Sequence, residues 1–155
     1  MKYIVLILLA VLYFTTEPTP CFYGCELTAR LLFHFHHSNI WHLIANGTCI
    51  YAMRKFCWIE SYVIAFLCSW VIISPTVGIS GMVFAAIGCN FGSQNMRKGL
   101  LKCGASAVLF GILPGVSMSF HLACLVVGYF TKYLWRKYRW VKLMNYSARK
   151  SEDAS

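Results

Sequence analysis

Acidic residues are scarce in this chain of 155 residues, which contains only five aspartates and glutamates together. The single aspartate is Asp153, next to the C-terminus, and Glu17, Glu26 and Glu60 are poorly placed to orient a distant histidine. A serine hydrolase triad needs an acid beside its histidine. The shortage of acids therefore argues against a triad, and it also removes the charged lining that a solute pathway would need.

Charge of either sign is low as well, at 12% of residues, against 59% hydrophobic residues and a mean hydropathy of +0.61. That composition leaves too little polar surface for a water-soluble domain and predicts a multi-span membrane protein. We expect an all-α bundle of six transmembrane helices occupying residues 1–135, followed by a basic juxtamembrane cytoplasmic tail, 136–155. The expected spans cover about 3–14, 38–56, 57–73, 80–93, 100–113 and 120–130.

The basic residues give this bundle an orientation. The net charge is +9, and six spans place every lysine and arginine except Arg30 on one side of the membrane. The positive-inside rule then predicts that both termini are cytoplasmic. The basic and aromatic stretch from Tyr133 to Lys150 is expected to lie on the anionic inner leaflet. This distribution argues against nucleic acid as a partner.

Most of the eight cysteines sit in or beside apolar runs, where cysteine behaves as a small hydrophobic residue. Cys21 and Cys25 alone would face outward, where a disulfide is chemically allowed but closes a very short loop. Whether they pair stays open at this stage.

Three histidines, His34, His36 and His37, fall within four residues. Such a cluster raises the alternatives of a metal site or of a transporter for metal or small solutes. No carboxylate or further ligand lies at helical spacing from them. We therefore expect no metal and no cofactor.

The motif Gly78-Ile79-Ser80-Gly81 opens the fourth expected span. A helix from Ser80 to Ser93 measures about 21 Å, less than the roughly 30 Å of a bilayer core. Ser80 is therefore expected in a recess below the outer surface. Irregular backbone at that depth implies a water-filled cavity.

Polar residues from three separate spans are expected at the depth of Ser80. His42 and Asn46 share one face of the second span, and His121 falls in the first turn of the sixth. Serine needs a base to take its proton, which predicts a Ser80–His121 dyad. The side chains of His42 and Asn46, with the Ser80 backbone N–H, supply donors for an oxyanion. Gly78 and Gly81 allow close approach of backbone and substrate.

The elbow G-x-S-x-G of soluble hydrolases is absent, because Met82 stands at its last glycine position. The pattern instead resembles the rhomboid intramembrane serine proteases over about residues 1–135. The residues that carry the resemblance are Gly78-x-Ser80-Gly81, His121 with Gly128 seven residues later, and His37-x4-His42-x3-Asn46. The resemblance implies a six-helix bundle with Ser80 as nucleophile and His121 as base. It also implies an oxyanion hole at His42 and Asn46, and an aromatic ring stacked on the base, here Phe84.

The chain departs from the family pattern in its first outer loop, which is short and has Ala29-Arg30 where the family has Trp-Arg. Phe120 stands where a small residue usually precedes the histidine, and Cys124 replaces a glycine on the helix-packing face. These changes affect loop anchoring and helix spacing and leave the catalytic groups in place.

The sequence thus predicts an intramembrane serine endopeptidase, integral and multi-pass, whose site opens to the extracytoplasmic side. Its expected partners are transmembrane protein substrates and the lipid bilayer. The alternative is a catalytically inactive rhomboid-like protein that binds transmembrane helices without cutting them.

Overall fold

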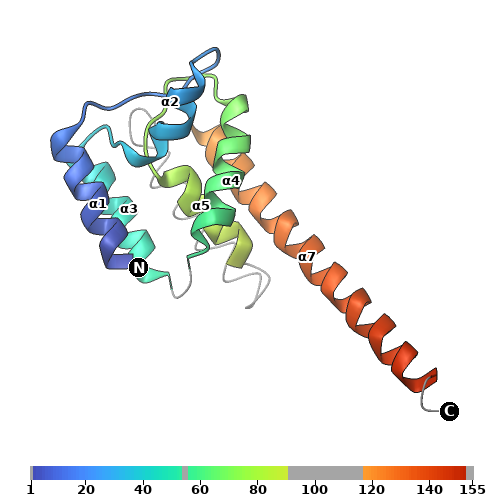
Figure 1. The fold of residues 1–155 in the computed structure, drawn as a ribbon. Coiled ribbons are helices and arrows are strands. Elements are labelled where there is room, and N and C mark those ends of the chain that lie inside the picture. The colour runs from blue at the N-terminus through green and yellow to red at the C-terminus, as the bar shows by residue number, and fades with distance from the viewer. Residues whose placement is uncertain (1, 54–55, 91–116, 153–155) are drawn as a thin grey trace.

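The computed structural model describes residues 2–53, 56–90 and 117–152, and most of them are helical (Figure 1). The α-helices are α1 (Lys2–Thr15), α2 (Leu27–Leu32), α3 (Ile40–Ala52), α4 (Trp58–Cys68), α5 (Ser80–Asn90) and α7 (Met118–Glu152). Two short 3-10 turns, η1 (Phe33–Phe35) and η2 (Ser69–Val71), follow α2 and α4.

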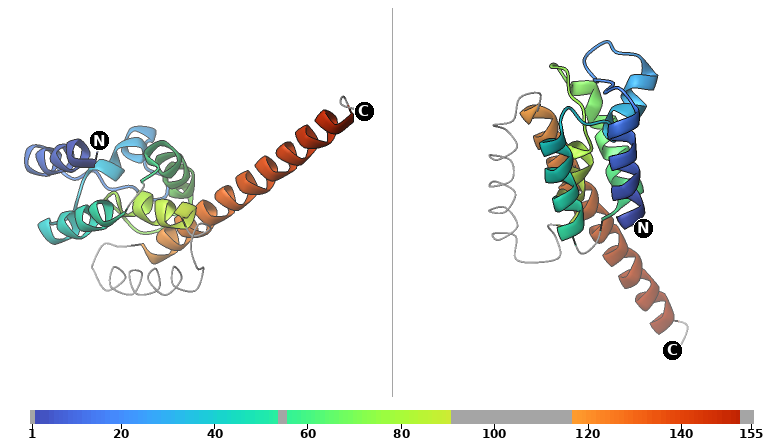
Figure 2. Two further views of the ribbon diagram at one scale, coloured as in Figure 1. Left: turned by 90° about the horizontal axis from the view of Figure 1, so that it is seen from below. Right: turned by 90° about the vertical axis from the view of Figure 1, so that its left-hand side faces the viewer.

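Helix α5 lies at the centre of the packing. It contacts α7, α4 and α3, and nine of its residues are buried. The helix pair α1 and α3 lies beside this group, and α7 extends well beyond it (Figures 1 and 2). A short helix that is buried on nearly all sides is a core element, so α5 holds whatever lies at its N-terminus in a fixed position.

Glycines set the separation of α5 and α7. A Cβ atom at Gly88 would collide with the Leu125 carbonyl oxygen, and one at Gly128 would collide with that of Ala85. The two backbones therefore touch directly, which small residues at a helix interface allow.

The long connection between α1 and α2 packs against the segment that leads into α5. Cys21 and Thr76 form an isolated antiparallel bridge with N···O distances of 2.8 and 2.9 Å. Gly78 then donates its N–H to the Phe33 carbonyl at 2.9 Å. Arg30 is buried and donates to the backbone carbonyl of Ser69 at 2.6 Å. These bonds fix the approach to Ser80.

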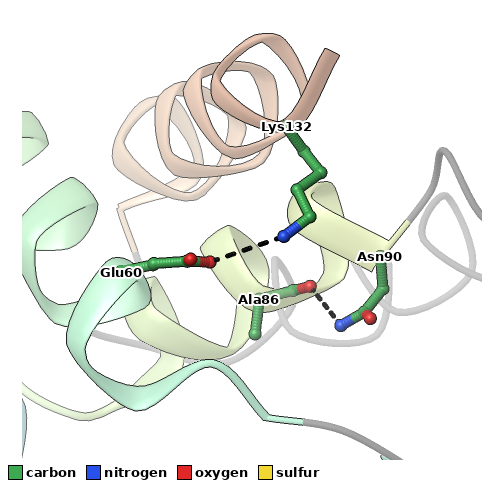
Figure 3. A network of polar contacts seen from close by, with 4 residues as sticks. All are labelled: Glu60, Ala86, Asn90 and Lys132. Atoms are coloured by element: carbon green, nitrogen blue, oxygen red, sulfur yellow. Dashed lines mark hydrogen bonds and ion pairs between the residues drawn. The ribbon is translucent and has the colours of Figure 1, made fainter. Parts of the chain in front are cut away.

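At the end of the helix group that is remote from Ser80, an ion pair joins α7 to α4, and this contact is weaker than the bonds described above (Figure 3). Lys132 of α7 lies 3.9 Å from a carboxylate oxygen of Glu60 on α4, and both side chains are partly exposed. Near the end of α5, the Asn90 side chain donates to the Ala86 carbonyl at 2.8 Å. An exposed ion pair of this kind contributes little, at most about 1 kcal/mol.

The predicted bundle of six transmembrane helices is wrong. Within residues 2–53, 56–90 and 117–152, no helix is both long enough and apolar enough to cross a membrane. Helices α1, α3, α4 and α5 have only 14, 13, 11 and 11 residues. At about 1.5 Å per residue, the longest of these spans roughly 21 Å, short of a bilayer core.

For α3 and α4, local interactions mark where the helix begins or ends. Helix α3 is capped at its N-terminus by Asn39, whose side chain accepts the His42 N–H at 2.8 Å, and it ends before Met53, which is extended. Helix α4 tightens into η2, where the Ser69 hydroxyl donates to the Phe66 carbonyl at 2.6 Å. Helix α7 has 35 residues, but the cations from Lys132 onward interrupt its apolar character.

The predicted location, an integral multi-pass protein with cytoplasmic termini and a site open to the extracytoplasmic side, is overturned by the same finding. The fifth expected span, 100–113, lies outside the described residues. The domain boundary expected at 135 falls inside α7, which continues unbroken through it.

Candidate active site

Ser80 and His121 lie within hydrogen-bond distance although 40 positions separate them in the chain. The Ser80 Oγ is 2.7 Å from His121 Nε2. Ser80 is the first residue of α5, and His121 lies in the first turn of α7. The close packing of α5 on α7 therefore brings the two side chains together.

The hydrogen bonds define which imidazole nitrogen carries the proton. His121 Nδ1 lies 2.6 Å from the Ser117 carbonyl oxygen, which can only accept. Nδ1 therefore donates, and Nε2 is the acceptor for the Ser80 hydroxyl. This is the tautomer that a base beside a serine needs.

The Ser117 carbonyl takes the orienting position that an aspartate has in a triad, and sequence reasoning missed it. The sequence signal was available, because Ser117 lies four residues before His121 and one helical turn separates such positions. A backbone acceptor leaves no trace in the side-chain composition, so a search for acids passes over it.

Burial lowers the pKa of His121. Ser80 and His121 are each only 1% exposed. Loss of solvation lowers the pKa of His121 to about 4; the Ser117 hydrogen bond opposes this effect and the nearby His42 adds to it. Phe84, one turn after the serine, presents its ring edge-to-face to the imidazole with centroids 4.9 Å apart. His121 is therefore neutral and able to accept a proton at pH 7.

His42 packs against the backbone that precedes Ser80. A Cβ atom at Gly78 would lie 2.6 Å from His42 Cε1, and Gly78 has a φ of 119° that disfavours other residues. The His42 Nδ1 is 3.4 Å from the Ser38 hydroxyl. Gly78 thus leaves the space that the His42 ring fills.

Several polar atoms near this position have no hydrogen-bond partner among the described residues. They are His42 Nε2, both ring nitrogens of His37, and the side-chain nitrogen and oxygen of Asn46. All three residues are at most 3% exposed. The His37 and His42 rings lie 5.4 Å apart. Buried polar groups without partners cost about 1–3 kcal/mol each, so donors and acceptors here are available to a bound ligand.

Gly81 also lies in a crowded position. A Cβ atom there would collide with the Phe120 ring and would lie 3.5 Å from Cys124 Sγ. The Phe120 ring is fully buried and packs against Phe33, with centroids 5.8 Å apart. Phe120 and Cys124 therefore both face the glycine that follows Ser80.

The histidine cluster is dispersed in the structure. His34 packs its ring against Tyr62, His36 Nδ1 accepts the Thr19 N–H at 3.0 Å, and His37 faces His42. In the described part of the chain, no three histidines, cysteines or acids are grouped so that they could hold a metal ion. Cys21 and Cys25 are free thiols with their sulfurs 3.6 Å apart.

Comparisons of the chain with models of protein families, with curated proteins and with solved structures found no match.

Proposed function

We propose that this protein is a serine endopeptidase of rhomboid type, with Ser80 as nucleophile and His121 as general base. The observation that carries the proposal is the chain of two hydrogen bonds from Ser80 Oγ to His121 Nε2 and from His121 Nδ1 to the Ser117 carbonyl. Packing alone does not require a serine and a histidine to meet in this tautomer.

The reaction follows from these atoms. As Ser80 Oγ bonds to the carbonyl carbon of a peptide, its proton moves to His121 Nε2. His121 then passes that proton to the leaving amine, and the C–N bond breaks to give an acyl-enzyme and a free amine. Water attacks the ester with His121 again as base, which releases the carboxylic acid and restores Ser80.

The tetrahedral intermediate carries an oxyanion that needs donors. His42 is neutral because burial lowers its pKa, and a Ser38 hydroxyl that donates to Nδ1 leaves the proton on Nε2. That N–H, the Asn46 amide and the backbone N–H of Ser80 are the proposed donors. One such donor is worth about 3 kcal/mol of transition-state stabilisation.

For the substrate we propose apolar peptide segments of the kind found in the transmembrane regions of other proteins. The outer faces of the helices expose large apolar side chains, among them Ile4 of α1, Trp41 of α3 and Ile59 of α4, which are 69%, 71% and 81% exposed. Large apolar side chains left exposed in this way support a proposal of apolar partners.

A fluorophosphonate probe, which forms a covalent bond with an activated serine, tests the dyad without knowledge of the substrate. We expect labelling of the wild type, and none of Ser80→Ala or of His121→Ala. Ser119→Ala serves as the matched control, because Ser119 lies near the site and contacts Ser117 rather than the dyad. Labelling that persists in Ser80→Ala would refute the assignment.

An inactive protein that binds apolar helices is the second candidate, and the burial of Ser80 favours it. The same experiment separates the two. If the wild type does not react while it retains a folded circular dichroism spectrum and binds an apolar helical peptide, the binding function is the correct one.

A further inference from the structure

Helix α7 has two parts with different surroundings. Up to Gly128 it packs on α5, and Lys132 makes the ion pair with Glu60. Beyond that ion pair the helix projects away from the other elements (Figures 1 and 2). Helices of this kind are stable on a surface rather than alone in water, so the projecting part is expected to have a partner.

An apolar stripe runs along this projecting part. Phe130, Leu134 and Tyr138 follow one another at intervals of four residues, and Val141 lies seven residues after Leu134. These spacings place all four on one helix face. They are 54%, 60%, 64% and 49% exposed, so the stripe is open.

The rest of the surface is cationic and aromatic. Lys137 and Lys142 border the stripe, and Arg136 and Arg139 lie about 140–200° around the helix from Leu134, given about 100° per residue. Tyr133 and Trp135 stand between the two faces. The sole acid within α7 is Glu152, at its last position. Charge complementarity therefore favours a negatively charged partner.

We propose that residues 130–142 of α7 bind the surface of an anionic phospholipid bilayer, with the stripe directed into the headgroup region and the helix axis parallel to the surface. Such a surface supplies both parts of the match, negative charge and an apolar layer within reach of the stripe. The attraction comes mainly from Lys137 and Lys142 beside the stripe, because the far face of a helix about 10 Å in diameter lies beyond the Debye length of about 8 Å at physiological salt. This binding is independent of the peptidase.

Two other kinds of partner fit residues 130–142 of α7 less well. A second copy of the helix would set cations against cations. A nucleic acid would pair with the cations, but it would leave the aliphatic side chains Leu134 and Val141 in water.

Flotation of the full-length protein with vesicles tests the proposal. We expect binding to phosphatidylcholine vesicles that contain phosphatidylserine, weaker binding to phosphatidylcholine alone, and loss of the difference at high salt. Lys137→Gln combined with Lys142→Gln should weaken binding about 25-fold, since each cation near an anionic surface contributes about fivefold. Equal binding to neutral and anionic vesicles would overturn the proposal.

A second set of variants tests whether the apolar stripe contributes to vesicle binding. Leu134→Glu with Val141→Glu should abolish binding to anionic vesicles. Leu27→Glu with Ile73→Glu is the matched control, since these residues are 58% and 84% exposed on the body of the protein, and it should bind as the wild type does. If the stripe variant still binds vesicles, or if the wild type prefers a single-stranded oligonucleotide to anionic vesicles, lipid is the wrong partner.

Discussion

The backbone carbonyl of Ser117 determines which ring nitrogen of His121 carries the proton. Because Ser117 accepts from Nδ1, the lone pair of Nε2 faces the serine hydroxyl at 2.7 Å. Among the described residues no carboxylate takes the usual orienting position, and a neutral acceptor does not stabilise an imidazolium as strongly. The low pKa of His121 follows from the same uncharged, buried surroundings.

The pH dependence of labelling should reflect that pKa. A pKa lowered from the usual 6.5 to about 4 keeps His121 neutral as the pH falls through 6.5, and activity is lost only as the pH approaches 4. The rate of fluorophosphonate labelling at about pH 5.5 should therefore stay within about twofold of its value at neutral pH. A half-maximal rate near pH 6.5, with the circular dichroism spectrum unchanged, would contradict this assignment.

Gly81 and Phe120 should behave as a coupled pair. Gly81→Ala drives a methyl group into the Phe120 ring and should lower the free energy of unfolding by about 1–3 kcal/mol. It should also slow labelling of Ser80, because the adjacent backbone must shift. Adding Phe120→Leu removes the far end of the ring and should restore part of both losses.

A double-mutant cycle measures this coupling by chemical denaturation and by labelling rate. Simple additivity of Gly81→Ala and Phe120→Leu, within about 0.5 kcal/mol, would show that the two residues do not meet as described.

Among the elements, α5 is the one on which the site depends. It starts at Ser80 and touches α7 backbone to backbone, so any change in the α5–α7 distance changes the separation of Ser80 from His121. Small residues such as Ala85 and Gly88 are therefore part of the site's geometry although they are remote from its chemistry.

Two helix glycines provide a matched test of that dependence. Gly88→Ala would meet the Leu125 carbonyl and lie 2.8 Å from the Tyr129 nitrogen, backbone atoms that cannot turn aside. We expect a loss of about 1–3 kcal/mol or more in the free energy of unfolding and slower labelling. Gly47→Ala in α3 meets only Leu6 Cδ2 at 3.5 Å and should stabilise the helix by about 0.5–1 kcal/mol. Equal effects of the two changes would refute direct contact of α5 with α7.

At the scale of the whole molecule, Arg30 joins segments that are far apart in the chain. It donates to the Ser69 carbonyl at 2.6 Å and to the Phe22 carbonyl at 3.3 Å, and its guanidinium lies 4.3 Å from the Trp70 ring centroid. No acid is among these partners, so backbone dipoles and an aromatic face hold the buried cation.

Arg30→Met should therefore cost about 1.5–3 kcal/mol, the usual contribution of hydrogen bonds from a charged group. Arg30→Lys should cost less, because it keeps the charge and loses the forked geometry. Thermal or chemical denaturation followed by circular dichroism measures both. A lysine variant as unstable as the methionine variant would show that the charge itself contributes nothing here.

Local spacing in the sequence was enough to nominate the candidate site. Ser80 between glycines, His121, and the i, i+4 pair His42 and Asn46 were all singled out from residue type and interval, and the structure places His42 against Gly78 and Ser80 against His121. The Ser117 acceptor and the contact of Phe120 with Gly81 were missed. Residue types alone do not show which backbone carbonyl accepts a hydrogen bond or in which direction an aromatic ring points.

Composition by itself determined that this chain is rich in helix-forming apolar runs and poor in acids, and therefore that any serine mechanism would rest on a dyad. Only the tertiary structure decided how long the helices are and which atoms meet. Hydropathy extends over a whole apolar run, whereas a helix ends where a cap, a tight turn or a neighbouring backbone stops it, as at Asn39, Met53 and Ser69. For that reason no helix of the described residues is long and apolar enough to cross a membrane, while the approach of α5 to α7, set by Gly88 and Gly128, brought Ser80 beside His121.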